Sequence, residues 1–417
     1  METRAIVRIA TAATRRRLAK ALRKNPSRSS ASRQNRGPRR IVYLNHGADL
    51  GGAEISLLEL LRGLDRERFE PFVVCPTEGD FVSVLRQERI PCQILALHRL
   101  RELDPLPYLA TVEQLSGLCR TLNAALVHSN SIYASQFGNP AGIRAGIPTV
   151  CHIREWLESE YGIASFMLDV ADRTVCVSNA ILKRYVALGG DARNAVAIHS
   201  GIRREPWESG CEDFRNELMI PPGSSIVSFV GRIDPNKRPH LFLRAAQRIH
   251  TVLPDVHFVL AGSSFAGHLE YRRRFDDEFM ASGMASHFHR LSFRCDVGRL
   301  LAASSALAFT SRHEGFPRAV IEAMLHGVPV VATRCEALEE YMEDGHNGYL
   351  VDAETEEAAV ERLAERILNV LQNGVPNDLQ RNASQTASGF GVEAHVESME
   401  ALYSDLLGTK VGACVSA

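Results

Sequence analysis

The sequence predicts an α/β protein with two doubly wound domains, each built on a parallel sheet with crossover helices. Short apolar runs recur along the chain and alternate with glycine turns and stretches of helical periodicity. This pattern restarts after a polar stretch with Pro and Gly, residues 203–225. All-apolar strands are typical of parallel sheets, whose faces are both covered by helices. The 417 residues, 45% of them hydrophobic, are enough for two full cores.

The N-terminal residues carry most of the positive charge. Residues 1–40 hold thirteen Lys or Arg and one acid, Glu2, a charge of about +12. Since the whole chain has a formal charge of −1, the remainder carries about −13. Apolar residues spaced among the cations of residues 3–24 are compatible with a basic amphipathic helix on an anionic membrane surface. A disordered, solvated tail is the alternative, and we assign residues 1–39 as a basic arm with either behaviour.

The cysteines and the hydropathy of the chain indicate the compartment in which the protein works. Nine cysteines occur singly, without a C-x-x-C or metal-ligand spacing, which favours a reducing compartment and predicts no metal site. No apolar run approaches the roughly 18 residues of a membrane span, and basic residues interrupt the N-terminal apolar stretches. We expect a cytoplasmic protein, peripheral on the inner face of the membrane if the arm binds lipid, with no nucleic-acid partner.

The first domain is expected over residues 40–203. A first strand, 41–44, ends at Asn45-His46-Gly47, and Gly51-Gly52 then opens a helix over 54–64. Further strands are expected at 72–75, 125–128, 149–151 and 174–177.

The second domain is expected over residues 204–388. Its strands are predicted at 226–230, 257–260, 306–310 and 328–331, and its helices at 238–251, 268–281 and 319–325. A final helix, 392–407, within the segment 389–408, carries an apolar face and is expected to return to the first domain.

Two carboxylates flank the turn that follows the strand at 306–310. Glu314 lies in the loop and Glu322 about one turn into the next helix, so both reach the same crevice at the carboxyl end of the sheet. Gly315 permits close backbone approach, and the N–H groups of a helix start favour a phosphate. A sugar nucleotide needs such acceptors for its hydroxyls and such donors for its phosphates. A solvated Glu in a loop and a second on a helix surface are the alternative.

The strand at 226–230 is followed by Arg232 and Lys237, a spacing at which two cations can grip a diphosphate. Solvated surface cations are the alternative. Gly262, after the strand at 257–260, is a further position for close backbone approach. Ser292-Phe293-Arg294 is suited to stacking and an amide contact with a nucleobase, although Phe293 fits a core equally well.

In this order, the motifs resemble those of the family-4 retaining glycosyltransferases of GT-B fold, over roughly residues 40–408. The motifs are the GlyArg…Lys of 231–237, LeuAlaGly at 260–262, SerArgHisGluGlyPhePro at 311–317 with Glu322, GlyValProValValAlaThr at 327–333 and GluAspGlyHisAsnGlyTyrLeuVal at 343–351. The resemblance implies two Rossmann-like domains facing across a cleft. It assigns Glu314 to the donor sugar, Glu322 to the ribose, and Arg232 with Lys237 to the diphosphate.

The first half carries two further matches. Gly51-Gly52 resembles the family's glycine loop, and His152 resembles an active-site histidine, with a core histidine as the alternative. The resemblance thus places Glu314, His152, Arg232 and Lys237 in catalysis and Glu322, Gly52, Gly262, Arg294, Gly315, Phe316 and Pro317 in donor binding. The chain departs from the family where Thr333-Arg334-Cys335-Glu336-Ala337-Leu338-Glu339 replaces a loop that often has two glycines.

The resemblance implies transfer of a sugar from a nucleoside diphosphate sugar to an acceptor hydroxyl, with the anomeric configuration kept. The acceptor would be a sugar, a glycan or a lipid-linked molecule in glycan, polysaccharide or glycolipid synthesis. Because no Asp-x-Asp motif is present and paired cations can replace a metal, we expect metal independence and no cofactor. A sugar-nucleotide 2-epimerase of the same fold and a non-catalytic sugar-nucleotide-binding subunit are the alternatives.

Overall fold

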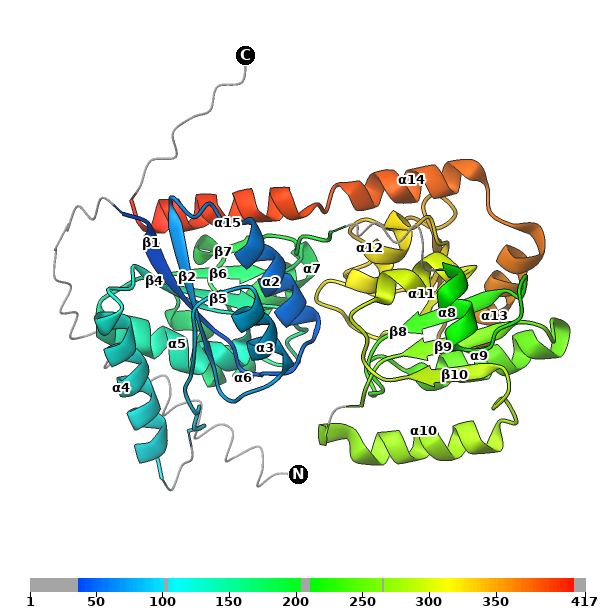
Figure 1. The fold of residues 1–417 in the computed structure, drawn as a ribbon, viewed down its shortest axis with the longest axis horizontal. Helices are drawn as coiled ribbons and strands as arrows, with labels where there is room; N and C mark the ends of the chain where they lie inside the picture. Colours follow the sequence, from blue (N-terminus) through cyan, green and yellow to red (C-terminus); the bar gives the residue numbers. More distant parts are fainter. Residues whose placement is uncertain (1–36, 101–103, 204–210, 265, 409–417) are drawn as a thin grey trace, which may run out of the picture. The chain divides into compact units, whose positions relative to one another are not determined.

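The protein consists of two compact α/β units, as the sequence predicts (Figure 1). The structure, a computed structural model, describes residues 37–100, 104–203, 211–264 and 266–408. Residues 1–36 of the predicted basic arm lie outside this range. The first unit is Met1–Gly201 with Val392–Ala417, and the second is Ile202–Gly391.

The first unit contains a seven-stranded parallel sheet with the strand order β3-β2-β1-β4-β5-β6-β7. Its strands are β1 (Arg39–Leu44), β2 (Phe69–Cys75), β3 (Cys92–Ile94), β4 (Leu126–Ser129), β5 (Thr149–Ile153), β6 (Arg173–Cys176) and β7 (Ala195–Ala197). Its α-helices are α2 (Gly52–Gly63), α3 (Asp80–Gln87), α4 (Leu106–Thr121), α5 (Ile132–Ala145), α6 (Tyr161–Ser165), α7 (Asn179–Ala187) and α15 (Val392–Leu406). Successive side chains of a strand point to opposite faces of the sheet. Ile41 and Tyr43 therefore pack with α2 and α15, whereas Val42 and Leu44 pack with α4 and α5.

The second unit contains a six-stranded parallel sheet with the order β10-β9-β8-β11-β12-β13. Its strands are β8 (Ile226–Val230), β9 (His257–Ala261), β10 (Phe288–Leu291), β11 (Ala306–Phe309), β12 (Val330–Thr333) and β13 (Tyr349–Val351). Its α-helices are α8 (Cys211–Glu217), α9 (Pro239–Val252), α10 (Leu269–Ala281), α11 (Val297–Ala303), α12 (Arg318–Leu325), α13 (Glu356–Asn373) and α14 (Asn377–Ser388). The strand order reverses between β8 and β11, and ligands of such sheets bind at the carboxyl ends of the strands at this point.

The last helix, α15, completes the core of the first unit, and it packs against α2. The hydroxyl of Tyr403 lies 2.6 Å from Nδ1 of His128 and accepts a hydrogen bond of 3.3 Å from the hydroxyl of Tyr43. Arg68 donates to the carboxylate of Glu400 at 2.6 Å. A Cβ at Gly63 would lie 2.5 Å from a methyl of Val396, so α2 and α15 approach closely at a glycine.

The boundaries between the units differ slightly from those that the sequence predicts. They fall at 201/202 and 391/392, whereas the expected positions are 203/204 and 388/389. The reason is a main-chain contact, since the N–H of Ile202 donates to the carbonyl of Phe390 at 2.8 Å. Residues 202–203 and 389–391 therefore belong to the second unit.

We expect Tyr403→Phe to destabilise the first unit by about 1–3 kcal/mol, because the buried Nδ1 of His128 would lose its partner. The other ring nitrogen, Nε2, already lacks a hydrogen-bond partner among the described residues. Denaturant unfolding measures the change. Tyr349→Phe, at a buried tyrosine of the second unit, is the control and should have a smaller effect. Equal stability of Tyr403→Phe and the wild type would contradict this role.

Candidate active site

Three loops at the carboxyl ends of neighbouring strands bring most of the predicted second-unit residues together. Residues 231–238 follow β8, residues 310–317 follow β11, and residues 334–339 follow β12. Because β8, β11 and β12 are adjacent and parallel, these loops emerge at one edge of the sheet, at the reversal of strand order.

The buried carboxylate of Asp234 organises the first of these loops. Its Oδ1 accepts hydrogen bonds from the main-chain N–H groups of Asn236 at 3.0 Å and Lys237 at 2.8 Å. Its Oδ2 accepts from Nε of Arg232 at 2.8 Å. One carboxylate therefore orients both predicted diphosphate ligands. Asp234 is not among the residues predicted from the sequence, although an Asp two residues before Asn236 is a recognisable turn signal.

Lys237 and Glu314 form an ion pair between the first two loops. Their side chains are only 19% and 10% exposed, so this pair is largely removed from water. Lys237 also lies over the ring of Phe309, with its Nζ 5.9 Å from the ring centroid. A lysine ammonium has three donors, so Lys237 can hold Glu314 and still donate to an anion.

Arg232 is much more open than Lys237. Its side chain is 61% exposed, and among the described residues only its Nε has a hydrogen-bond partner. The remaining donors of the guanidinium fork are therefore available to a phosphate.

Asn236 fastens the first loop to the second. Its side-chain amide donates to the carbonyl of His313 at 2.8 Å, and its amide oxygen accepts from the N–H of His313 at 3.2 Å. Arg238 adds a hydrogen bond of 2.7 Å to the carbonyl of Thr310. The position of Glu314 is thus fixed relative to Lys237 by main-chain contacts on both sides of the loop.

The third loop is fastened to the second by two side chains. The hydroxyl of Thr333 donates to the carbonyl of Ser311 at 3.2 Å. The Nδ1 atom of His313 lies 3.1 Å from a carboxylate oxygen of Glu336. The three loops therefore form one hydrogen-bonded assembly.

Glu322, which was predicted from its spacing to Glu314, lies on α12. Its carboxylate accepts a hydrogen bond of 3.2 Å from Arg318, and its side chain is 25% exposed. The helix begins at Arg318, directly after Pro317, so the loop amides and Glu322 are carried by one strand-to-helix turn. Gly315 is buried within that turn.

Phe316 is used in packing. Its ring centroid lies 5.3 Å from that of Phe390 and 6.3 Å from that of Tyr341. The aromatic ring is therefore occupied within the core, and a donor contact at this position would have to come from the main chain.

Gly262 is a position of close approach, but the close partner is protein rather than open space. Its φ is +156°, and a Cβ would lie 2.0 Å from the carbonyl oxygen of Gly231. The glycine lets the end of β9 pass against the start of the loop that carries Arg232. Gly262 therefore affects the site indirectly, through the packing of the loop that carries Arg232.

The guanidinium of Arg294 is already held by two carboxylates. It donates to Asp296 at 2.7 Å and forms an ion pair with Glu217, and it lies 5.4 Å from the ring centroid of Phe214. Hydrogen bonds with Asp296 and Glu217 raise its pKa. Phe293 is 39% exposed, so it is not the core residue that the alternative interpretation expects.

His152 lies inside strand β5, not just past its end as the sequence analysis expects. It is fully buried, and its ring stacks on that of His128 at 5.5 Å between centroids. Burial, together with the nearby charge of Arg154, holds its pKa well below the ordinary value, so the ring is neutral at pH 7. Neither ring nitrogen has a hydrogen-bond partner among the described residues. The catalytic role of His152 stays a prediction.

Gly52 is the first residue of α2, after Gly51 in an extended conformation. The adjoining carboxylate of Glu54 is buried and accepts a hydrogen bond of 2.9 Å from the side-chain amide of Asn45. The second glycine of the pair therefore opens a helix whose start is fixed by a polar contact with the end of β1.

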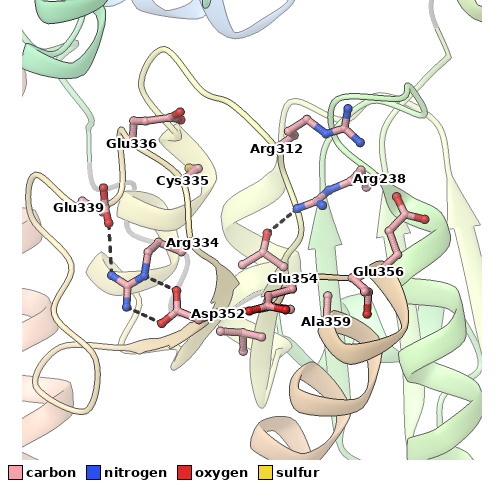
Figure 2. Close-up of a pocket in the computed structure, with 14 residues that line it drawn as sticks. Arg238, Arg312, Arg334, Cys335, Glu336, Glu339, Asp352, Glu354, Glu356 and Ala359 are labelled. Atoms are coloured by element: carbon pink, nitrogen blue, oxygen red, sulfur yellow. Dashed lines mark hydrogen bonds and ion pairs between the residues drawn. The ribbon is translucent and has the colours of Figure 1, made fainter.

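A cavity of about 490 Å³ adjoins the three loops on the side of β12 and β13 (Figure 2). Figure 2 shows the guanidinium of Arg334 between Asp352 and Glu339, and Arg238 and Arg312 beside each other on another wall. Glu336 lies on the same loop as Arg334 but apart from that ion pair. Charged side chains of both signs thus line this cavity.

Comparisons with known proteins agree with this architecture. Residues 50–205 match the family described as Glycosyltransferase Family 4, and residues 211–388 match the family described as Glycosyl transferases group 1. Together these matches span both units. The chain belongs to the family-4 glycosyltransferases. It is therefore a transferase, as the sequence analysis expects.

Among curated relatives, the Escherichia coli UDP-Gal:α-D-GlcNAc-diphosphoundecaprenol α-1,3-galactosyltransferase is 22% identical over 399 residues, covering 86% of this chain and 97% of the relative. The D-inositol 3-phosphate glycosyltransferase of Mycolicibacterium smegmatis is 29% identical over 243 residues. That alignment covers 57% of this chain and spans 54% of the relative's length.

Solved structures share the fold. Anabaena Alr3699/HepE in complex with UDP and glucose superposes with a TM-score of 0.76 at 23% identity, covering 88% of this chain and 100% of that one. A glycosyltransferase from Rickettsia africae superposes with a TM-score of 0.71 at 15% identity, covering 89% of this chain and 100% of that one. The GT-B class is thus confirmed.

No cluster of three or more His, Cys, Asp or Glu side chains in the part that the structure describes is arranged to hold a metal ion. No helix in the same residues has the length and apolar character needed to span a bilayer.

We expect Gly262→Ala to disturb the assembly of loops, because the new methyl would press on the carbonyl of Gly231. Overpacking of this kind costs about 1–3 kcal/mol. Calorimetric unfolding measures the loss of stability, and titration with a nucleoside diphosphate should show weaker binding because the loop of Arg232 moves.

Gly327→Ala is the matched control, since Gly327 also has a positive φ, +71°, but nothing lies within 4 Å of its Cβ position. It should be destabilised only by the roughly 1–2 kcal/mol of a left-handed residue, with unchanged binding of the nucleoside diphosphate. Equal effects at the two glycines would contradict the role assigned to Gly262.

Proposed function

We propose that the protein transfers a sugar from a uridine diphosphate sugar to an acceptor hydroxyl, with retention of the anomeric configuration. The observation that carries this proposal is the assembly in which Asp234 orients Arg232 and Lys237, and Lys237 pairs with Glu314. It supplies cations for a diphosphate next to a carboxylate for sugar hydroxyls. The uridine base is taken from the E. coli relative, whose printed name specifies a UDP donor, and from the UDP complex of the Anabaena protein.

The reaction breaks the bond between the anomeric carbon and the diphosphate oxygen, so negative charge grows on the leaving diphosphate. Arg232 and Lys237 are already oriented before the donor arrives, which reduces the reorganisation that this charge would demand. The amides at the start of α12 would add a favourable dipole. Glu314 would accept from hydroxyls of the transferred sugar, and Glu322 from the ribose.

Retention is proposed through a front-face path, in which the acceptor hydroxyl attacks from the side that the diphosphate leaves. A leaving phosphate oxygen takes the acceptor's proton, so no separate protein base is required. Lys237 is suited to this step because its ammonium would stabilise the departing phosphate while its pairing with Glu314 keeps it in place.

For the acceptor we propose a lipid-linked sugar, in polysaccharide or glycolipid synthesis. The support is the E. coli relative, whose acceptor is a sugar diphosphoundecaprenol and whose length the alignment covers almost entirely. A membrane-borne acceptor fits the predicted basic arm, whose +12 charge would attract an anionic bilayer. The protein would then work peripherally at the cytoplasmic face.

Incubation with a panel of nucleoside diphosphate sugars tests the reaction. We expect release of UDP from at least one uridine donor, and faster release when a sugar-diphosphate-lipid acceptor is present. NMR of the product should show the same anomeric configuration as in the donor sugar. Because Arg232 and Lys237 are assigned the diphosphate, turnover should survive excess EDTA. Inversion at the anomeric carbon, or loss of activity that magnesium or manganese restores, would contradict the proposed chemistry.

We expect Glu322→Ala to weaken UDP binding by roughly ten- to a hundredfold. Each hydrogen bond from a ribose hydroxyl to this charged acceptor is worth roughly 1.5–3 kcal/mol. Isothermal titration calorimetry measures the affinity. Glu365→Ala, at an exposed glutamate of α13, should match the wild type. Wild-type affinity in Glu322→Ala would reject the ribose assignment.

A further inference from the structure

Glu336 occupies a position of the third loop at which the sequence analysis notes a departure from the family's common glycines. Its side chain is 41% exposed and lines the cavity of Figure 2. Among the described residues its carboxylate has one hydrogen-bond partner, Nδ1 of His313 at 3.1 Å. An ionised carboxylate offers about four acceptor sites, so most of its hydrogen-bonding capacity is unused.

His313 fixes this carboxylate relative to the predicted donor residues. The histidine directly precedes Glu314, and its main chain is held on both sides by the amide of Asn236, at 2.8 and 3.2 Å. Asn236 in turn directly precedes Lys237. These hydrogen bonds therefore fix the position of the Glu336 carboxylate relative to the Lys237–Glu314 ion pair.

The chemistry of the position limits what Glu336 can bind. A carboxylate accepts hydrogen bonds and repels phosphate, so it cannot be a ligand of the diphosphate. Glu314 is paired with Lys237 and its side chain is only 10% exposed, whereas that of Glu336 is 41% exposed, so Glu336 presents the more open carboxylate at this edge of the sheet. In a site for a sugar nucleotide, the donors left for Glu336 are hydroxyl or amide groups of the sugar.

We propose that Glu336 is a specificity-determining residue, which accepts a hydrogen bond from a ring substituent of the transferred sugar, and that His313 is its positioning residue. The inference rests on the proposed function, because it requires a sugar nucleotide on the three loops. It deepens that function by naming the residue that distinguishes one sugar from its epimer. An epimer that turns its hydroxyl away leaves the carboxylate without its partner, and such sites discriminate strongly.

The test compares kcat/KM for UDP-glucose, UDP-galactose, UDP-N-acetylglucosamine and UDP-N-acetylgalactosamine in the full-length enzyme. For Glu336→Gly we expect at least a tenfold fall with the preferred sugar, little change with the others, and hence a flattened preference. Glu336→Gln keeps one acceptor oxygen and should lie between this variant and the wild type. His313→Phe should flatten the preference less, because the carboxylate remains but is no longer held.

Two controls distinguish a loss of sugar specificity from a general disturbance of the site. Glu354→Gln removes a charge from the same cavity, at a residue without a hydrogen bond or ion pair among the described residues, and should keep the wild-type preference. UDP affinity, measured by calorimetry, should be the same in the wild type and all four variants, because none of these side chains is assigned to the nucleotide.

Unchanged ratios among the four donors in Glu336→Gly would overturn the inference. An equal loss with every donor, together with weaker UDP binding, would also overturn it, since Glu336 would then only fasten the loops. Wild-type enzyme that consumes none of the donors while binding no UDP would instead reject the proposed function, and the inference with it.

Discussion

The ion pair of Lys237 and Glu314 is the constraint on which the second-unit site depends. Removing a lone ammonium or carboxylate from water costs several kcal/mol, so neither side chain would be stable at 19% and 10% exposure without the other. The pairing also demands a particular geometry of two loops, and Asp234 and Asn236 supply it through main-chain hydrogen bonds. Charge burial and loop geometry thus support each other. A phosphate that approaches Lys237 meets a cation whose position is already determined.

This arrangement explains how a site that lies largely in loops can have a defined geometry. Loops at the carboxyl ends of parallel strands usually owe their shape to their own turns. Here each loop is also bonded to its neighbour: Arg238 to Thr310, Thr333 to Ser311, and His313 to Glu336. The sheet brings the loops together at the reversal of strand order, and side chains of one loop then complete the main-chain hydrogen bonding of the next. Binding groups held in this way lose little entropy when a ligand arrives.

Much of the fold was predictable, because all-apolar strands in parallel sheets leave a clear trace in the sequence. Strand β8 has the predicted bounds, and α9, α12 and α15 begin and end within a residue or two of expectation. Strands β3 and β7 were not predicted; each has three residues and lies at the sheet edge, where its side chains are only partly buried or exposed. Spacing predicted that Arg232, Lys237, Glu314 and Glu322 would share one edge. It could not show that the ring of Phe316 packs in a core or that Arg294 is held by Glu217, because those partners are distant in sequence.

The position of α15 has a consequence for how the chain reaches its native state during synthesis. The core of the first unit includes Val392, Val396, Met399 and Tyr403, which leave the ribosome nearly two hundred residues after the sheet they cover. Until then, the face of that sheet formed by Ile41 and Tyr43 lacks part of its cover, and the hydroxyl of Tyr403 is absent from His128. The second unit, by contrast, is continuous in sequence and has all its strands before α15 emerges. The order of completion is therefore opposite to the order of translation, and a ribosome-bound chain exposes an apolar surface that chaperones recognise.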